Sequence, residues 1–235
     1  MISLEHRSEH IEIMDNLNCD GEVVYQTLRE LDFINQWLGG NQVTISALEK
    51  VWVERGDNDE VTIVDLGCGS GEMLRIIAEL AEKQNRKIRL IGIDANPNII
   101  QYAVNHSNGF KNISFQAIDI FSEEFRKEKF DIVIATLFFH HFSNDQLARF
   151  FSQLRKQAIR AIIVNDIHRH VLAFYSIKWL TFLFSKSKMV KYDAPLSVRR
   201  AFKRQELKSL LEKAGIKNYQ LKWKWAFRWQ LIIFL

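Results

Sequence analysis

The chain is poor in the residues that mark secreted, fibrous and membrane-spanning proteins. Its 235 residues include only two cysteines, Cys19 and Cys68, whose separation excludes a metal-type spacing and a disulfide framework. With 2 prolines and 10 glycines, no low-complexity linker is expected. The most apolar run, residues 170–184, is interrupted by Lys178 and is too short to span a bilayer. Because the N-terminus is also polar, the default expectation is a cytoplasmic protein.

The charge of the chain is mild and dispersed. The formal net charge is +4, and the content of 47% hydrophobic and 26% charged residues is typical of one soluble domain with a modest extension. Nucleic-acid binders concentrate their charge in a patch, so no nucleic-acid partner is expected. Basic residues do cluster at 186–204, and they suit an acidic partner, a membrane surface or water. Monomer and homodimer both stay open.

Hydrophobic periodicity divides the chain into three regions. Helices predicted at 22–38 and 44–53 form an N-terminal helical cap over residues 1–55. Between residues 61 and 166, strands alternate with helices, and several strands are apolar on both faces. This pattern indicates a parallel sheet covered by helices on both sides. The predicted strands are 61–66, 88–94, 112–118, 130–136 and 161–165, and the predicted helices are 71–83, 96–105 and 145–157.

The last region predicts a helical insert followed by a hairpin. An apolar helix at 171–184 is followed by a basic, polar segment, a helix at 204–214, and two strands at 219–225 and 228–234. The fold class is therefore α/β: a Rossmann-like, seven-stranded, mostly parallel sheet with helices on both faces. It carries an N-terminal helical extension and a helical lid insert, residues 168–203, after the fifth strand. Residues 56–235 form the ligand-binding domain.

A glycine-rich turn follows the first predicted strand. The segment 64–72 reads VDLGCGSGE, so Gly67, Gly69 and Gly71 leave the backbone open to a ligand. The dinucleotide pattern G-x-G-x-x-G would need glycine at Glu72. A dinucleotide would place a negatively charged pyrophosphate at such a turn. Asp65, just before the turn, instead suits a positively charged ammonium group of the ligand.

Two further acids follow the next strands. Asp94 ends the second strand, where a carboxylate can accept both hydroxyls of a ribose. Asp119 follows the third strand, where it can accept an adenine amino group. Open α/β sheets bind ligands at the carboxyl ends of their strands, so the glycine turn and these acids are expected to share one site.

From residue 61 to 166 the chain resembles class I S-adenosylmethionine-dependent methyltransferases, whose first motif is an acid followed by G-x-G-x-G. The resemblance implies S-adenosylmethionine as cofactor and S-adenosylhomocysteine as product. A flavodoxin-like or oxidoreductase fold with coincidental acids is the alternative. The residues that the resemblance assigns to the cofactor are Asp65, Gly67, Cys68, Gly69, Gly71, Asp94, Ala95, Asn96, Asp119, Ile120 and Thr136.

The sequence gives weaker evidence for the methyl acceptor than for the cofactor. Residues 135–142, ATLFFHHF, lack the N/D-P-P-Y/F motif of many amino methyltransferases and resemble the L-H-H-F segment of small-molecule methyltransferases. Phe139, His140 and His141 are therefore expected near the acceptor, with His141 as a catalytic residue. The alternative is that both histidines cap the following helix or bond to the backbone.

After the fifth strand, His168 is the expected general base, oriented by Asp166 two residues away. A loop histidine with a structural bond is the alternative. His168 and His170 have the spacing of a metal pair, but no third ligand lies at an informative distance in sequence, so no metal is expected.

The insert carries an apolar helix and basic residues. Tyr175, Trp179 and Arg199 are expected to contact an aromatic or lipophilic acceptor. Packing of the insert on the N-terminal helices is the alternative, and peripheral contact with a membrane is compatible with either.

The sequence thus predicts methyl transfer to a hydroxyl or activated carbon of an aromatic, quinone-like or polyketide small molecule. An RNA or protein methyltransferase, which needs an open cleft, remains an alternative. So does an inactive cofactor-binding partner subunit.

Overall fold

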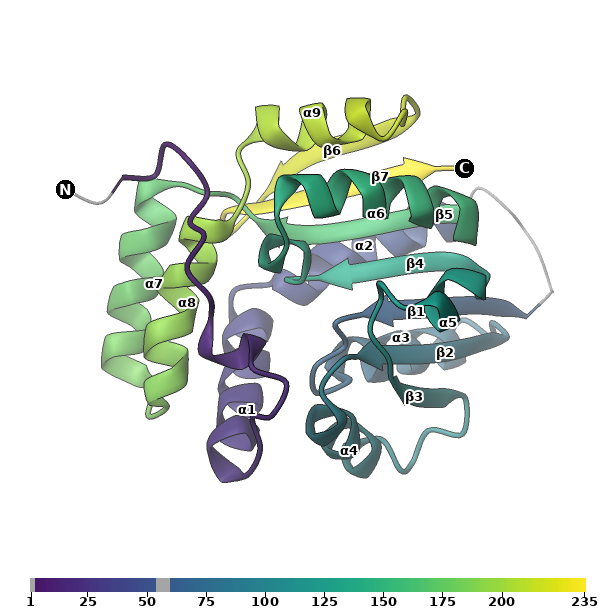
Figure 1. Ribbon diagram of the computed structural model, residues 1–235. Helices are drawn as coiled ribbons and strands as arrows, with labels where there is room; N and C mark the ends of the chain where they lie inside the picture. Colours follow the sequence, from purple (N-terminus) through teal and green to yellow (C-terminus); the bar gives the residue numbers. More distant parts are fainter. Residues whose placement is uncertain (1–2, 54–59) are drawn as a thin grey trace.

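A computed structural model describes residues 3–53 and 60–235 of the chain. One sheet of seven strands lies at its centre, in the order β3-β2-β1-β4-β5-β7-β6 (Figure 1). β7 is antiparallel to β5 and β6, while the pairs among β1 to β5 are parallel. The predicted mostly parallel, Rossmann-like sheet is therefore confirmed. The strands are β1 Val61–Leu66, β2 Ile88–Asp94, β3 Ile113–Ala117, β4 Phe130–Thr136, β5 Ala158–Ile167, β6 Tyr219–Lys224 and β7 Arg228–Phe234.

Helices cover both faces of the sheet, because β1 and β4 alternate apolar side chains between two cores. Val64 joins a core built with α5, α6 and α9, whereas Ile63 joins a core built with α2, α3 and α4. Both side chains are fully buried, as expected of parallel strands covered on both sides. The helices are α1 Glu22–Trp37, α2 Gly40–Val53, α3 Glu72–Lys83, α4 Pro97–His106, α5 Glu123–Lys127, α6 Asn144–Gln157, α7 Val171–Phe184, α8 Lys188–Arg200 and α9 Arg204–Lys213, with short 3₁₀ turns η1 Ile13–Asp15 and η2 Phe139–His141.

The predicted N-terminal cap consists of two helices with different surroundings. Leu48 and Trp52 of α2 are buried in the core beneath the sheet, so α2 is part of a helical layer. α1 stands beside the insert instead, packed against α8 (Figure 1). The domain boundary predicted between residues 55 and 56 falls in the segment 54–59, outside the described residues.

The insert after β5 is a pair of helices, α7 and α8, packed against each other beside α1. α7 was predicted, but α8 replaces the segment that the sequence analysis left without a helix. The hydroxyl of Ser187 caps α8 by accepting the Val190 N–H at 3.2 Å. Met189 and Leu196 lie on its buried face. Pro195 inside the helix conceals this pattern, because proline ordinarily interrupts a helix.

Candidate active site

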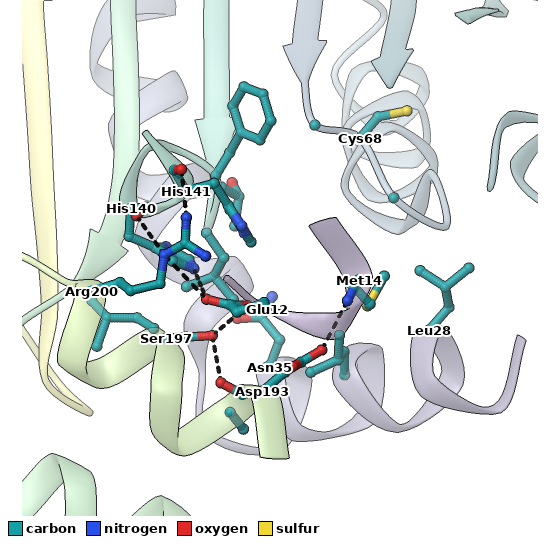
Figure 2. A pocket seen from close by; sticks show the side chains of 18 of the residues that line it. Glu12, Met14, Leu28, Asn35, Cys68, His140, His141, Asp193, Ser197 and Arg200 are labelled. Atoms are coloured by element: carbon teal, nitrogen blue, oxygen red, sulfur yellow. Dashed lines mark hydrogen bonds and ion pairs between the residues drawn. The ribbon is translucent and has the colours of Figure 1, made fainter. Parts of the chain in front are cut away.

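A cavity of about 820 Å³ opens at the carboxyl ends of β1, β2 and β4. β1 and β4 are neighbours in the sheet, but the strand order runs away from them in opposite directions. Such a switch point leaves a crevice above the sheet, where open α/β folds bind ligands. α1, α7, α8 and the N-terminal segment form the remaining walls (Figure 2). The volume is within the range of small-molecule sites.

The glycine turn after β1 forms one end of the cavity. The N–H groups of Gly67 and Cys68 both donate to the Ile93 carbonyl oxygen of β2, at 2.8 and 3.0 Å. Gly67 has φ +66°, and a Cβ there would lie 2.1 Å from the ring of Phe138. The position therefore requires glycine for both its backbone conformation and its close approach to β4.

Two acidic side chains beside this turn suit a cation and a ribose. Asp65 is buried, and its Oδ1 has no hydrogen-bond partner among the described residues. Burial, and then the charge of Asp94, raise the pKa of Asp65 well above its usual value. Asp94 accepts the Asn96 N–H at 3.0 Å through Oδ1, and the backbone of Gly69 in the glycine turn also bonds its carboxylate. An ammonium group would satisfy Asp65, because a buried carboxylate without a partner is costly.

The predicted cofactor residues converge on this end of the cavity. Gly71 is the exception, because it ends the turn as the N-terminal cap of α3 and does not line the cavity. Those that line it are Asp65, Gly67, Cys68, Gly69, Asp94, Ala95, Asn96, Asp119, Ile120 and Thr136.

α1 contributes polar side chains that the sequence analysis missed. Asp32, Asn35 and Asn41, the last from α2, line the cavity beside the glycine turn. Asn35 donates to Asn41, which donates to Glu72 at 3.1 Å. Burial raises the pKa of Asp32 to about 7, and the nearby Glu72 adds to the rise. Asp32 and Asn35 interrupt the apolar pattern of α1, and this interruption could have indicated that they face a polar site.

The other end of the cavity carries a cluster of histidines and carboxylates. His140 lies on η2, after β4, and its Nδ1 is 2.8 Å from Oδ1 of Asp166 at the end of β5. The His140 N–H also donates to Oδ2 of Asp166 at 3.1 Å. Burial favours protonation of Asp166, but His140 outweighs it and lowers the pKa of Asp166. Asp166 therefore orients His140, and not His168 as predicted.

His141 is held in the same way by a residue of the N-terminal segment. Its Nδ1 lies 2.5 Å from Oδ1 of Asp15, and Oδ2 of Asp15 accepts Nη1 of Arg200 at 2.5 Å. Burial opposes a charge on His141, but the hydrogen bond to Asp15 and the charge of Glu12 raise its pKa above the usual value. Likewise, burial would raise the pKa of Asp15, but His141 and Arg200 lower it. The pair therefore favours the charged forms of both groups.

The N-terminal segment reaches the cluster by lying across α8 (Figure 1). Its Ser8 N–H donates to the Arg199 carbonyl oxygen at 3.0 Å. The carboxylate of Asp193 accepts the N–H groups of Ile13 and Met14, at 2.8 and 3.1 Å. These bonds hold Glu12 and Asp15 in the wall of the cavity. The sequence analysis placed neither residue in the site.

The predicted general base lies elsewhere. His168 does not line the cavity; its ring is 4.8 Å from that of Trp229, and its N–H donates to the Phe227 carbonyl oxygen. Burial, and then the neighbouring His170, lower its pKa. The geometry corresponds to the structural alternative for His168.

Of the residues predicted to contact the acceptor, some line the cavity and others do not. His140 lines the cavity, but Phe139 is buried in the core on one face of the sheet. Tyr175 and Trp179 lie on the outer side of α7 with 44% and 61% of their surface exposed, and they do not line the cavity. Arg199 is also absent from the wall, which its neighbour Arg200 joins. The α7 residues that face inward are Ala173, Ser176, Ile177 and Leu180.

The outer side of α7 is a separate feature, the α7 apolar face. Its large side chains are 44–76% exposed: Val171, Leu172, Tyr175, Trp179, Phe182, Leu183 and Phe184. Contiguous exposed apolar side chains mark interaction surfaces. Within residues 3–53 and 60–235, no helix has the length and apolar character needed to cross a bilayer.

Residues 57–215 match the model of a family described as a methyltransferase domain. The protein-lysine N-methyltransferase EFM4 of Saccharomyces cerevisiae is 38% identical over 80 residues, which make up 33% of this chain and 33% of that protein. The ribosomal protein L11 methyltransferase of Hydrogenovibrio crunogenus is 32% identical over 93 residues, 39% of this chain and 29% of that protein. The chain thus spans about a third of the length of these curated relatives.

The fold is shared with solved methyltransferase structures. Human N-acetylserotonin methyltransferase in complex with S-adenosylmethionine superposes with a TM-score of 0.64 at 17% identity, over 92% of this chain and 56% of that one. The family model covers more than half of the chain. The chain therefore belongs to the methyltransferase-domain family, within class I of the S-adenosylmethionine-dependent methyltransferases, and its cofactor is S-adenosylmethionine.

Proposed function

We propose that the protein methylates a hydroxyl or an activated carbon of a lipophilic small molecule that is aromatic, quinone-like or polyketide in character. The observation that carries this proposal is the cavity, which extends from the glycine turn to His140 and His141 between walls from α1, α7 and α8. When bound, S-adenosylmethionine supplies an electrophilic methyl group and leaves as a neutral thioether. The protein therefore has mainly to align the acceptor, exclude water and accommodate the loss of the acceptor's proton.

The residues divide these tasks between the two ends of the cavity. Asp65 and Asp94 are proposed to hold the ammonium and ribose groups of the cofactor. The acceptor oxygen is held at the histidine end, where Nδ1 of His140 and of His141 each bond a carboxylate. Those bonds direct both rings and leave both Nε2 atoms without a hydrogen bond to the described residues. Leu28, Ile177 and Leu180 supply apolar wall for the body of the acceptor.

The partial cover of the acceptor end argues against a protein or RNA acceptor. The names of the two curated relatives include protein substrates, but their similarity covers at most 39% of this chain. A lysine side chain or a nucleotide enters through an open cleft, whereas here the N-terminal segment is bonded across α8 over the acceptor end. The same relatives keep a protein methyltransferase as the second candidate.

The direct test supplies purified protein with S-adenosylmethionine and measures S-adenosylhomocysteine. Acceptors would be lipophilic phenols, quinols and β-dicarbonyl compounds, compared with protein and RNA extracts. We expect turnover with the first group. Turnover with the extracts alone would contradict the proposal, and tight cofactor binding without turnover on any acceptor would favour an inactive partner subunit. In the same protein, Asp94→Ala should weaken cofactor binding by about 10–100-fold, as expected for lost hydrogen bonds to a charged group; unchanged affinity would remove the ribose assignment.

We further propose that the α7 apolar face contacts an anionic membrane surface, from which a lipophilic acceptor enters. Lys178, Lys186, Lys188 and Lys191 are exposed on or beside this face. α7 contains no acidic residue, and the acid of α8, Asp193, is buried against the N-terminal segment. Aromatic side chains surrounded by lysines have the composition of interfacial membrane-binding helices.

A further inference from the structure

We propose that Glu12, His140 and His141 bind a divalent transition-metal ion, such as Zn²⁺, at the acceptor end of the cavity. Each of the three residues offers one ligand atom, and these atoms lie within 4.8 Å of one another. Two imidazoles and one carboxylate make up a common ligand set for first-row divalent ions. The role of the ion rests on the proposed methyl transfer, but its binding does not.

The hydrogen bonds of the two imidazoles support this assignment. In metal sites, the histidine nitrogen that does not bind the metal usually donates to a carboxylate, which fixes the ring and its tautomer. Here Nδ1 of His140 bonds Asp166 at 2.8 Å, and Nδ1 of His141 bonds Asp15 at 2.5 Å. Both rings thus have the outer partner of a metal ligand, and His141, whose charged form Asp15 favours, would release its Nε2 proton when the ion binds.

Glu12 provides a second, independent observation. Its side chain is 5% exposed, and Oε1 has no hydrogen-bond partner in the part of the chain that the structure describes. Oε2 accepts the Ser197 hydroxyl at 3.0 Å, which fixes the carboxylate (Figure 2). Oε1 lies 3.7 Å from Nε2 of His140. A buried carboxylate oxygen without a donor is costly, and a cation would satisfy it.

The spacing of the three ligand atoms suits an ion, and one nearby positive charge opposes it. Metal–ligand bonds of 2.0–2.1 Å place neighbouring ligand atoms about 3–3.5 Å apart. The 3.7 Å between Nε2 of His140 and Oε1 of Glu12 needs little adjustment, whereas the wider pairs, within 4.8 Å, need a rotation of the His141 side chain. Arg200 opposes a second cation, because its Nε lies 3.8 Å from Oε1 of Glu12. However, Nη1 of Arg200 is bonded to Asp15, so part of the charge of this guanidinium is balanced without Glu12.

The proposed ion would act on the acceptor and not on the cofactor. A hydroxyl of the acceptor binds the ion as an oxyanion after its proton has passed to water. The oxyanion then forms the new bond to the methyl carbon, and the electron pair of the broken sulfur–carbon bond stays on sulfur. No oxidant or reductant is needed, because the metal serves as a Lewis acid. This specifies acceptors whose methylated atom is a hydroxyl or enol oxygen.

The test measures metal binding directly. Untagged full-length protein is stripped with a chelator, titrated with Zn²⁺ by calorimetry and analysed for metal content. We expect one ion per chain. Glu12→Gln and His141→Ala should each lower the affinity at least about tenfold, and Asp15→Asn, which removes an outer partner, about 10–100-fold. His170→Ala is the matched control, since His170 lies outside the cavity, and it should bind as the unaltered chain does.

Co²⁺ distinguishes this site from adventitious binding. Bound Co²⁺ should show visible absorption bands that Glu12→Gln alters and His170→Ala does not. Binding lost only in the His170 variant, or no binding at all, would overturn the proposal. Methyl transfer that continues undiminished in excess chelator would overturn the role of the ion in the reaction while leaving the proposed function intact. Zn²⁺ binding through Glu12 without any turnover would support the site and count against the proposed acceptor.

Discussion

Oδ1 of Asp15 lies 2.5 Å from Nδ1 of His141, although 126 residues separate them in the sequence. Asp15 belongs to the N-terminal segment, and His141 follows β4. The contact therefore makes the acceptor end of the cavity depend on a segment that lies outside the region 57–215 matched by the family model. The cofactor end also touches this segment, because the side chain of Asn96 donates to the Cys19 carbonyl oxygen at 3.0 Å, but no ionisable side chain of the segment takes part in that contact.

The contact between Asp15 and His141 predicts that a mutation of Asp15 affects the acceptor end more than the cofactor end. We expect Asp15→Asn to lower kcat at least about tenfold, because His141 loses the carboxylate that orients it, while the dissociation constant of S-adenosylmethionine changes less than twofold. Steady-state kinetics and calorimetry measure the two quantities. His168→Ala is the control and should keep kcat within about twofold, since His168 is directed toward Trp229 and away from the cavity. A large loss of kcat in that variant would return the base assignment to His168.

Asp32 predicts a pH dependence of cofactor affinity. Its pKa is raised to about 7, first by burial and then by Glu72, so the group is mostly neutral at pH 6. As the pH rises from 6 to 7.5, the charged fraction increases from about one tenth to about three quarters. The carboxylate then attracts the positively charged cofactor, so affinity should rise several-fold over this range. The α-amino group of the cofactor titrates near pH 8 and stays mostly charged.

Calorimetry at both pH values, with Asp32→Asn as reference, checks this dependence. The variant should bind with nearly the same affinity at pH 6 and 7.5. If the unaltered chain and Asp32→Asn showed the same slope, the charge of Asp32 would not contribute to binding.

The conformation and surroundings of Gly67 predict that this position tolerates only glycine. In Gly67→Ala, the left-handed backbone costs about 1–2 kcal/mol, and the contact with the Phe138 ring adds about 1–3 kcal/mol of overpacking. We expect a lower melting temperature and loss of cofactor binding. Gly109→Ala is the matched control, because a Cβ there meets no described atom within 4 Å; its stability should change by less than about 0.5 kcal/mol. Equal effects of the two variants would exclude the proposed reason for glycine at 67.

The sequence indicated which residues line the cofactor end of the cavity because its signals there are local. The acid–glycine turn is contiguous, and Asp94 and Asp119 follow strands whose order in a parallel sheet brings their ends together. The acceptor end was predicted poorly because its parts meet only through tertiary packing. Asp15 carries no motif of its own. Arg199 was predicted to face the acceptor, but Arg200 faces the cavity instead. The difference arises because α8 was not predicted, and the helix determines which of the two side chains faces the cavity.

α7 shows a second limit of sequence patterns. Its range was predicted, but apolar residues occupy its whole circumference, so periodicity does not identify the inner side. Trp179 was therefore assigned to the pocket that Ile177 and Leu180 line. Small and medium side chains face the cavity, Phe174 is buried against α8, and Tyr175, Trp179 and Phe182 face outward.

That outward face predicts binding to anionic vesicles. Trp179 and Phe182 are 61% and 64% exposed, and burying such side chains is worth about 1.5–3 kcal/mol each. The nearby lysines add about 1 kcal/mol each near an anionic surface. In sedimentation assays, we expect binding to vesicles that contain phosphatidylglycerol and little binding to pure phosphatidylcholine. The double variant Trp179→Ser/Phe182→Ser should bind at least about tenfold more weakly. Trp223→Ser, at a tryptophan of β6 that is 48% exposed, is the control and should bind normally. A dimer that the double variant dissociates, with no vesicle binding, would instead identify a second copy of the chain as the partner of this face.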